Sequence, residues 1–106
     1  MNDNNTLLNA FSLERGGNYE NEIKTYNYIN RDNPNFIIAK LGSGRSNFRL
    51  EWFPTSLKDF STVLSQVENK EAFYYKAKIH KISVEFIVQM IIFINPLTWM
   101  KELENK

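Results

Sequence analysis

A glycine-rich loop between two runs of β-favouring residues constrains the fold of this chain more than any other feature of its sequence. Residues 36–41 and 47–53 are rich in aromatic and branched side chains, and Gly42-Ser43-Gly44 lies between them. Glycine adopts the positive φ angles that a short hairpin loop requires. The pattern therefore predicts a β-hairpin in the middle of the chain, with residues 42–46 as its loop.

The segments before this hairpin predict a further strand and a turn. Residues 19–29 alternate loosely in β-favouring residue types, which indicates a strand. Residues 31–35 carry turn chemistry, because proline fixes φ and the Asp and Asn side chains bond their own backbone. Residues 1–17 are rich in asparagine and end at two glycines, so we expect a partly ordered segment with one or two helical turns.

After the hairpin, the apolar residues first follow a helical period and then lose it. Spacings of three and four predict an amphipathic helix over residues 56–67, with hydroxyl side chains at its start. Residues 73–82 alternate and residues 84–94 are apolar and β-branched, which favours two strands and leaves one helix as the alternative. Asn95-Pro96 predicts a short C-terminal helix that reaches about Glu104.

These elements define an α+β fold. We expect an antiparallel sheet of four or five strands, with the amphipathic helix packed across one face and the short helix at the C-terminus. The chain has 106 residues, of which 42% are hydrophobic and 14% aromatic, so it is long enough and apolar enough to bury a core. Its length predicts a single domain over residues 1–106.

Composition excludes several classes of protein. A net charge of +1 is too small to hold nucleic acid or an anionic membrane without a local cluster of charge. The absence of cysteine excludes disulfides, thiolate metal sites and a cysteine nucleophile, and it suits a reducing cytoplasm. The first residues lack the basic and apolar pattern of a signal peptide, and the apolar run 82–94 is shorter than the roughly 20 residues of a membrane span. We therefore expect a cytoplasmic protein.

No constellation of residues points to catalysis, to a metal or to a cofactor. His80 is the one histidine, and it lies between lysines rather than beside a carboxylate that would orient it. Gly42 and Gly44 lead into a predicted strand, whereas phosphate-binding loops lead into a helix. The acidic residues are scattered without the spacing of a metal loop. We therefore expect no enzyme, no catalytic residue, no metal site and no cofactor.

The most informative stretch for function is residues 24–49. It carries five basic residues and one acid, interleaved with four aromatic residues on the predicted strands. Cations hold phosphates, and aromatic rings stack on unpaired bases, so this combination is typical of proteins that bind single-stranded nucleic acid. A solvated strand face beside core aromatic residues would show the same pattern. The basic residues are Lys24, Arg31, Lys40, Arg45 and Arg49.

The same stretch resembles a known family. The run Phe36-Ile37-Ile38-Ala39-Lys40-Leu41-Gly42-Ser43-Gly44-Arg45-Ser46-Asn47-Phe48-Arg49-Leu50 is similar to the purine-rich-element-binding (PUR) repeat, which reads Ile-Ala-Glu-Val-Gly-x-Gly and then Ser-Arg-Leu. Arg31-Asp32-Asn33 resembles the Lys-x-Asn at the end of the second strand of that repeat. The likeness covers residues 21–67. Phe48 stands where the family has a small serine, and residues 70–106 replace the second repeat.

The resemblance implies a fold, a partner and a site. PUR repeats are four-stranded antiparallel sheets with a helix across one face, they pair with one another, and their open sheet face binds single-stranded DNA or RNA. The site residues implied on this chain are Arg31, Asn33 and Arg49, with Lys40 and Arg45 on the neighbouring surface. The single-strand binders of the Whirly kind have a similar order of strands and helix.

Two functions therefore stand as hypotheses. The first is a module that binds single-stranded DNA or RNA through a basic and aromatic sheet face. The alternative is a small protein-binding inhibitor or immunity-type factor, of the kind that phages and mobile elements encode, which blocks a host protein. In either case residues 84–94 are more apolar than a small two-layer domain needs, so we expect a homodimer that buries part of this run.

Overall fold

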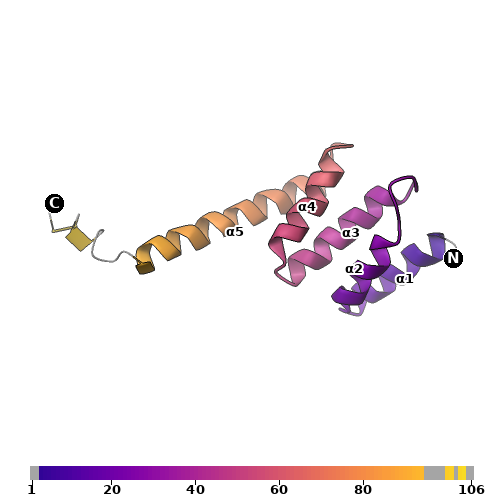
Figure 1. Ribbon diagram of the computed structural model, residues 1–106, viewed down its shortest axis with the longest axis horizontal. Coiled ribbons are helices and arrows are strands. Elements are labelled where there is room, and N and C mark those ends of the chain that lie inside the picture. Colours follow the sequence, from indigo (N-terminus) through magenta and orange to yellow (C-terminus); the bar gives the residue numbers. More distant parts are fainter. Residues whose placement is uncertain (1–2, 95–99, 102, 105–106) are drawn as a thin grey trace. The chain divides into compact units, whose positions relative to one another are not determined.

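The structure is a computed structural model that describes residues 3–94, 100–101 and 103–104, and its regular structure is helical (Figure 1). In chain order the helices are α1 (Asp3–Arg15), α2 (Tyr19–Asn27), α3 (Phe36–Arg49), α4 (Phe53–Leu64) and α5 (Lys70–Ile94). The described residues contain no β-strand. The predicted α+β fold, with its antiparallel sheet of four or five strands, is therefore wrong.

The chain divides into two compact units, Met1–Lys76 and Ala77–Lys106. The first unit holds α1 to α4 and the first turns of α5, and the second unit holds the rest of α5. Within the first unit, α1 packs on α2, α2 on α3 and α3 on α4, and α1 also reaches α3 (Figure 1). Helix α3 is thus the central helix of the first unit.

The predicted hairpin is wrong because its glycines lie inside α3. Neither Gly42 nor Gly44 has a positive φ, and the described glycine that does is Gly17, at 78° in the connection from α1 to α2. A Cβ added at Gly42 would overlap the ring of Tyr26 on α2, and one added at Gly44 would lie 2.7 Å from Cζ of Phe60 on α4. The two glycines therefore serve close helix packing rather than a turn.

Small and polar residues make up most of the buried face of α3, which is why its helical period is hard to see. Ser43, Ser46 and Asn47 are each 1% exposed or less, and Ala39 is equally buried. Hydrophobic periodicity detects a helix through apolar residues at spacings of three and four. On α3 these positions hold serine, glycine and asparagine, so the apolar residues alone suggested two strands.

Helix α5 replaces the two strands predicted over residues 73–82 and 84–94. It begins after Asn69, whose side-chain Oδ1 accepts a hydrogen bond from the backbone N–H of Ala72 at 2.9 Å. Asparagine caps helices in this way. Valine and isoleucine cost a helix only about 0.7 kcal/mol per residue at most relative to alanine. Since no Gly or Pro interrupts the run, the helix continues to Ile94.

Of the other predicted elements, some are confirmed and some are wrong. The amphipathic helix expected at 56–67 is confirmed as α4, although it begins earlier, with Pro54 in its first turn. The turn at 31–35 is confirmed, whereas residues 19–29 form α2 instead of a strand and α1 extends further than one or two turns. The start of the predicted C-terminal helix lies outside the described residues. Residues 100–101 and 103–104 are helical.

Aromatic side chains join the first turns of α5 to the rest of the first unit. The ring of Tyr75 stacks on that of Phe60 with 4.9 Å between centroids and 2° between planes. Phe48 of α3 meets Tyr75 edge-on, with 5.1 Å between centroids. Such pairs add about 0.5–1.5 kcal/mol beyond the burial of their area. They hold α3, α4 and the start of α5 together.

Candidate functional site

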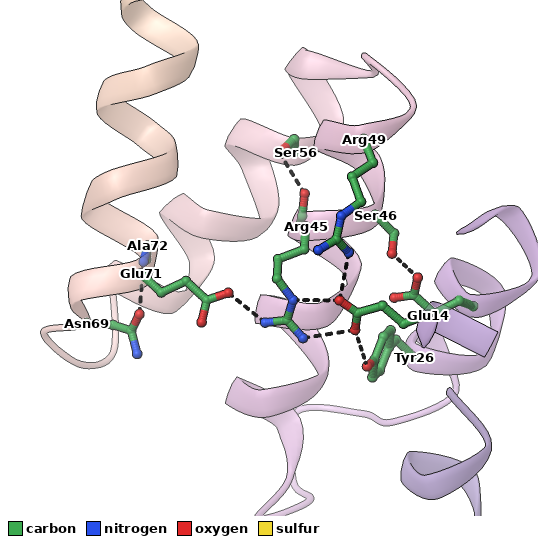
Figure 2. A network of polar contacts seen from close by, with 11 residues as sticks. Glu14, Tyr26, Arg45, Ser46, Arg49, Ser56, Asn69, Glu71 and Ala72 are labelled. Atoms are coloured by element: carbon green, nitrogen blue, oxygen red, sulfur yellow. Dashed lines mark hydrogen bonds and ion pairs between the residues drawn. The ribbon is translucent and has the colours of Figure 1, made fainter. Parts of the chain in front are cut away.

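Arg45 is one of the five residues predicted to bind nucleic acid. It lies at the centre of a network of charged side chains (Figure 2). Its Nε and Nη2 donate to the two carboxylate oxygens of Glu14 at 2.8 and 3.0 Å. Its Nη1 donates to Oε1 of Glu71 at 2.6 Å. Arg45 thus joins α1, α3 and the start of α5, and the fork-shaped guanidinium suits this bidentate pairing.

Arg49 and Tyr26 complete the pairing of Glu14. Nη1 of Arg49 donates to Oε2 of Glu14 at 2.8 Å, and the Tyr26 hydroxyl donates to Oε1 at 3.1 Å. The Arg49 guanidinium also lies over the ring of Tyr19, 5.4 Å from its centroid. Two cations and a hydroxyl therefore surround one carboxylate whose side chain is 13% exposed.

The network changes the acidity of its members. Burial by itself raises the pKa of Glu14, but the hydrogen bonds from Arg45 and Arg49 outweigh burial and lower that pKa to about 2. Hydrogen bonding to Glu14 likewise raises the pKa of Arg45, against the opposite effect of burial. Glu14 is therefore ionised and Arg45 charged at neutral pH, which fits a structural ion pair rather than a proton donor or acceptor.

A second carboxylate, Glu22 of α2, lies in the same region, but its pKa is shifted upwards and not downwards. It is fully buried, its Oε2 accepts a hydrogen bond from the Ser46 hydroxyl, and its Oε1 has no hydrogen-bond partner. Burial, reinforced by the negative charge of Glu14, raises the pKa of Glu22 from 4.5 to about 8. Glu22 is therefore protonated at neutral pH.

Lys40 takes part in a different cluster, between α3 and α4. Its Nζ lies 3.8 Å from Oδ1 of Asp59, whose Oδ2 accepts hydrogen bonds from the Ser43 hydroxyl at 2.7 Å and from Nδ2 of Asn47 at 2.9 Å. Burial raises the pKa of Asp59, while Ser43 and Lys40 oppose this effect. The acid has these three partners and little exposure, which again fits a structural role.

The remaining predicted residues lie elsewhere. Arg31 is exposed in the turn between α2 and α3, and Asn33 in the same turn accepts a hydrogen bond from the backbone N–H of Asn35 at 2.7 Å. The structure therefore brings Arg45 and Arg49 together but does not gather them with Lys40, Arg31 and Asn33 on one face. The sheet face on which these residues were expected does not exist in the described part of the chain.

A surface groove of about 550 Å³ opens beside the network. This volume is within the range of small-ligand sites. Of its three charged residues, Glu14 and Arg49 pair with each other and Arg15 is the third, while the other lining side chains are apolar or aromatic. The residues that line it are Leu8, Phe11, Glu14, Arg15, Tyr19 and Arg49.

Glu14 and Glu71, which hold the two arginines, are the residues that sequence reasoning missed. Glu14 is separated from Arg45 by 31 positions and from Arg49 by 35. No local spacing connects residues this far apart, so neither partner could be assigned from the pattern. The spacing of Arg45 and Arg49, four positions apart, would have placed them on one face had the segment been read as a helix.

The most unusual surface of the molecule is on the second half of α5. Nine large apolar side chains between residues 84 and 94 are each at least 43% exposed, and Phe93 reaches 86%. We call these nine residues the α5 apolar surface. Its members are Val84, Phe86, Ile87, Val88, Met90, Ile91, Ile92, Phe93 and Ile94.

Polar residues interrupt this surface only on one narrow stripe. Glu85 and Gln89 are four positions apart and thus share one side of the helix. The apolar residues occupy the rest of its circumference. A helix that is apolar nearly all round is normally covered by other protein or by lipid.

Within the part of the chain that the structure describes, no helix is long and apolar enough to cross a membrane. The same residues contain no group of three or more acidic or histidine side chains that could hold a metal ion. His80 lies exposed on α5.

Comparisons with protein-family models, with curated proteins and with solved structures find no match to this chain. The four-stranded sheet that resemblance to the PUR repeat implies is contradicted by the helices described above. Function therefore has to follow from the residues of this chain.

Proposed function

We propose that this protein acts as a non-catalytic protein-binding module and that its binding surface is the α5 apolar surface. The observation that carries the proposal is the exposure of nine large apolar side chains on the end of one helix. Fully burying a side chain of this kind stabilises a complex by about 1.5–3 kcal/mol.

The size of this surface supports a protein partner. Burying one such side chain removes roughly 60–120 Å² of apolar area, so nine half-exposed ones present on the order of 500 Å². The largest apolar patch on a typical monomer is about 300–600 Å² and often functional. A partner that covers this area and its polar rim approaches the roughly 800 Å² per side of a standard interface.

The charge networks support this reading because three of the five basic residues between positions 24 and 49 already pair with carboxylates. Arg45 and Arg49 pair with Glu14, and Lys40 pairs with Asp59. A phosphate would have to displace these carboxylates before it could bind. Binding of single strands through the predicted residues therefore stays a prediction without a surface to support it, and we do not propose it.

The proposal keeps one part of the inhibitor hypothesis, namely that this protein binds another protein. A small chain that presents one apolar helix surface fits a factor that blocks or joins another protein. The lack of cysteine fits a reducing compartment such as the cytoplasm, where such a partner would be met.

The test is chemical cross-linking in the cells that produce the protein. Lys78 and Lys81 immediately precede the α5 apolar surface, so a lysine-reactive cross-linker should join them to whatever covers it. We expect cross-linked peptides from another polypeptide chain. A variant with Phe86→Gln, Ile87→Gln, Ile91→Gln and Phe93→Gln should lose them, because glutamine keeps the helix but not the apolar surface.

Arg31→Ala is the matched control, since Arg31 is exposed in a turn distant in sequence from α5 and should keep the cross-links. Cross-links that survive in the four-residue variant would contradict the proposal. So would steeply salt-dependent binding of labelled single strands at about 50 mM salt, retained by the four-residue variant and weakened by Arg31→Ala.

A further inference from the structure

The exposed side of α5 carries a heptad pattern. Ala77, His80, Val84, Ile87, Ile91 and Ile94 follow one another at alternating spacings of three and four, and all six are exposed. We call these six residues the α5 seam. Side chains at such spacings form one stripe along a helix and, when apolar, mark the contact of a coiled coil. In that scheme Ala77, Val84 and Ile91 are a positions and the other three are d positions.

The residue types of the seam suit contact between copies of the same helix. Val84, Ile87, Ile91 and Ile94 fill two successive a and d layers with β-branched side chains. Isoleucine at both a and d favours bundles of three or four helices over pairs. The e and g positions beside these layers hold Val88 and Met90, which are apolar and half exposed, so they widen the contact beyond one seam.

The alternative of a lipid surface fits the same residues less well. A helix that lies in a membrane interface has a strongly polar face rich in lysine and arginine. From residue 82 to 94 the single charged side chain is Glu85, which is negative and would be repelled by anionic lipid. A net charge of +1 on the whole chain, by contrast, opposes the approach of a second copy only weakly.

Resting on the proposed function, we propose that the chain which covers the α5 apolar surface is a further copy of this protein, and that three or four α5 helices join through the α5 seam. The seam is self-complementary, since the same apolar layers meet when two copies align. Each further helix covers another part of the apolar circumference, which one partner alone would leave partly in water. A bundle of this kind buries most of the nine exposed side chains.

The test is the mass of the full-length protein in solution, measured by analytical ultracentrifugation at micromolar concentration. We expect three or four times the chain mass of 12.5 kDa. The variant Ile87→Gln with Ile91→Gln should sediment as a monomer, because it places amides in adjacent d and a layers. Both residues are exposed within a single chain, so far-UV circular dichroism should show unchanged helix content.

The matched control is Phe86→Gln with Phe93→Gln. These residues are as exposed as the seam residues but occupy c positions, away from the a and d layers. This variant should keep the mass of the parent. A monomeric parent would overturn the inference, as would equal loss of association in both variants, which indicates non-specific clustering of apolar surface. A stable dimer would overturn the number of helices.

The outcome is distinguishable from failure of the proposed function. If the parent is monomeric yet its α5 lysines cross-link to a different protein, the inference fails and the proposed function stands. If the parent is monomeric and binds vesicles of anionic lipid, without cross-links to any chain, both fail.

Discussion

The surroundings of two carboxylates in the first unit shift their pKa values in opposite directions. Glu14 is ionised because Arg45 and Arg49 donate to it, and the stability that it contributes is lost only as pH falls from 4.5 towards 2. Glu22 is protonated because it is fully buried beside the Glu14 charge. The two arginines thus balance the negative charge of Glu14, whereas a negative charge on Glu22 would not be balanced.

We predict that Glu22 makes the protein less stable as pH rises. Its pKa in the folded state is about 8 and its ordinary value is 4.5, so between these values the folded chain holds a proton that the unfolded chain has released. The free energy of unfolding should therefore fall from pH 4.5 to pH 8, with a slope approaching about 1.4 kcal/mol per pH unit. Glu22→Gln should remove this slope, as measured by urea denaturation across that pH window.

Glu20→Gln provides the control for this prediction. Glu20 lies on the same helix and its substitution removes the same charge, but it is exposed. Its variant should keep the pH dependence of the parent. If Glu22→Gln and Glu20→Gln had the same profile, Glu22 would have to be ionised in the folded protein.

The residues that sequence reasoning selected were only partly informative. Arg45 and Arg49 do lie together, yet the partners that they bind are carboxylates of α1 and α5 rather than a ligand. A pattern of basic and aromatic residues reports composition along the chain. It cannot show which acids a fold brings to those residues from 26 to 35 positions away.

At the scale of elements, the glycines of α3 decide how closely the helices approach. Sequence reasoning assigned Gly42 and Gly44 to a loop because glycine is the residue that turns most often require. In the structure they face the rings of Tyr26 and Phe60. Two properties of glycine, its conformational freedom and its lack of a side chain, could each explain its presence at these positions. The sequence did not distinguish between them.

We predict that Gly44→Ala destabilises the protein, because an overpacked core usually costs about 1–3 kcal/mol. The added Cβ would lie 2.7 Å from Cζ of Phe60, a ring that is fully buried and stacked on Tyr75. The gain of about 1 kcal/mol in helix propensity offsets part of this cost, which leaves a net loss of up to about 2 kcal/mol. Thermal unfolding should show a lower midpoint.

Gly16→Ala is the matched substitution, since its Cβ would meet backbone atoms at ordinary distances of 3.5 and 3.7 Å. It should leave stability unchanged or raise it by about 0.4–1 kcal/mol. An unaltered midpoint for Gly44→Ala would mean that α3 and α4 do not pack as described.

Whether a helix could be predicted from the sequence depended on the residue types of its buried face. Helix α4 was predicted because Phe60 and Val63 follow a helical period and are fully buried. Helix α3 was missed because serine, glycine and asparagine form its buried face. The second half of α5 was missed because apolar residues on nearly all sides leave no period to detect.

At the scale of the whole molecule, the proposed bundle predicts that thermal stability depends on protein concentration. A state that exists only as an assembly is favoured by mass action, so the unfolding midpoint of the parent should rise as the protein becomes more concentrated. The variant Ile87→Gln with Ile91→Gln should lack this dependence. Scanning calorimetry over a hundredfold range of concentration would measure both, and a parent midpoint that does not move would contradict assembly.

The packing of α1 to α4 on their neighbours in the sequence has a consequence for how the chain folds as it is made. Units built from such local contacts fold in microseconds to milliseconds, whereas synthesis proceeds at about 5–20 residues per second. Helices α1 to α4 therefore have time to pack on one another before the second half of α5 leaves the ribosome. The residues of the α5 apolar surface follow the first unit in the chain, so they leave the ribosome after α1 to α4 have had time to pack.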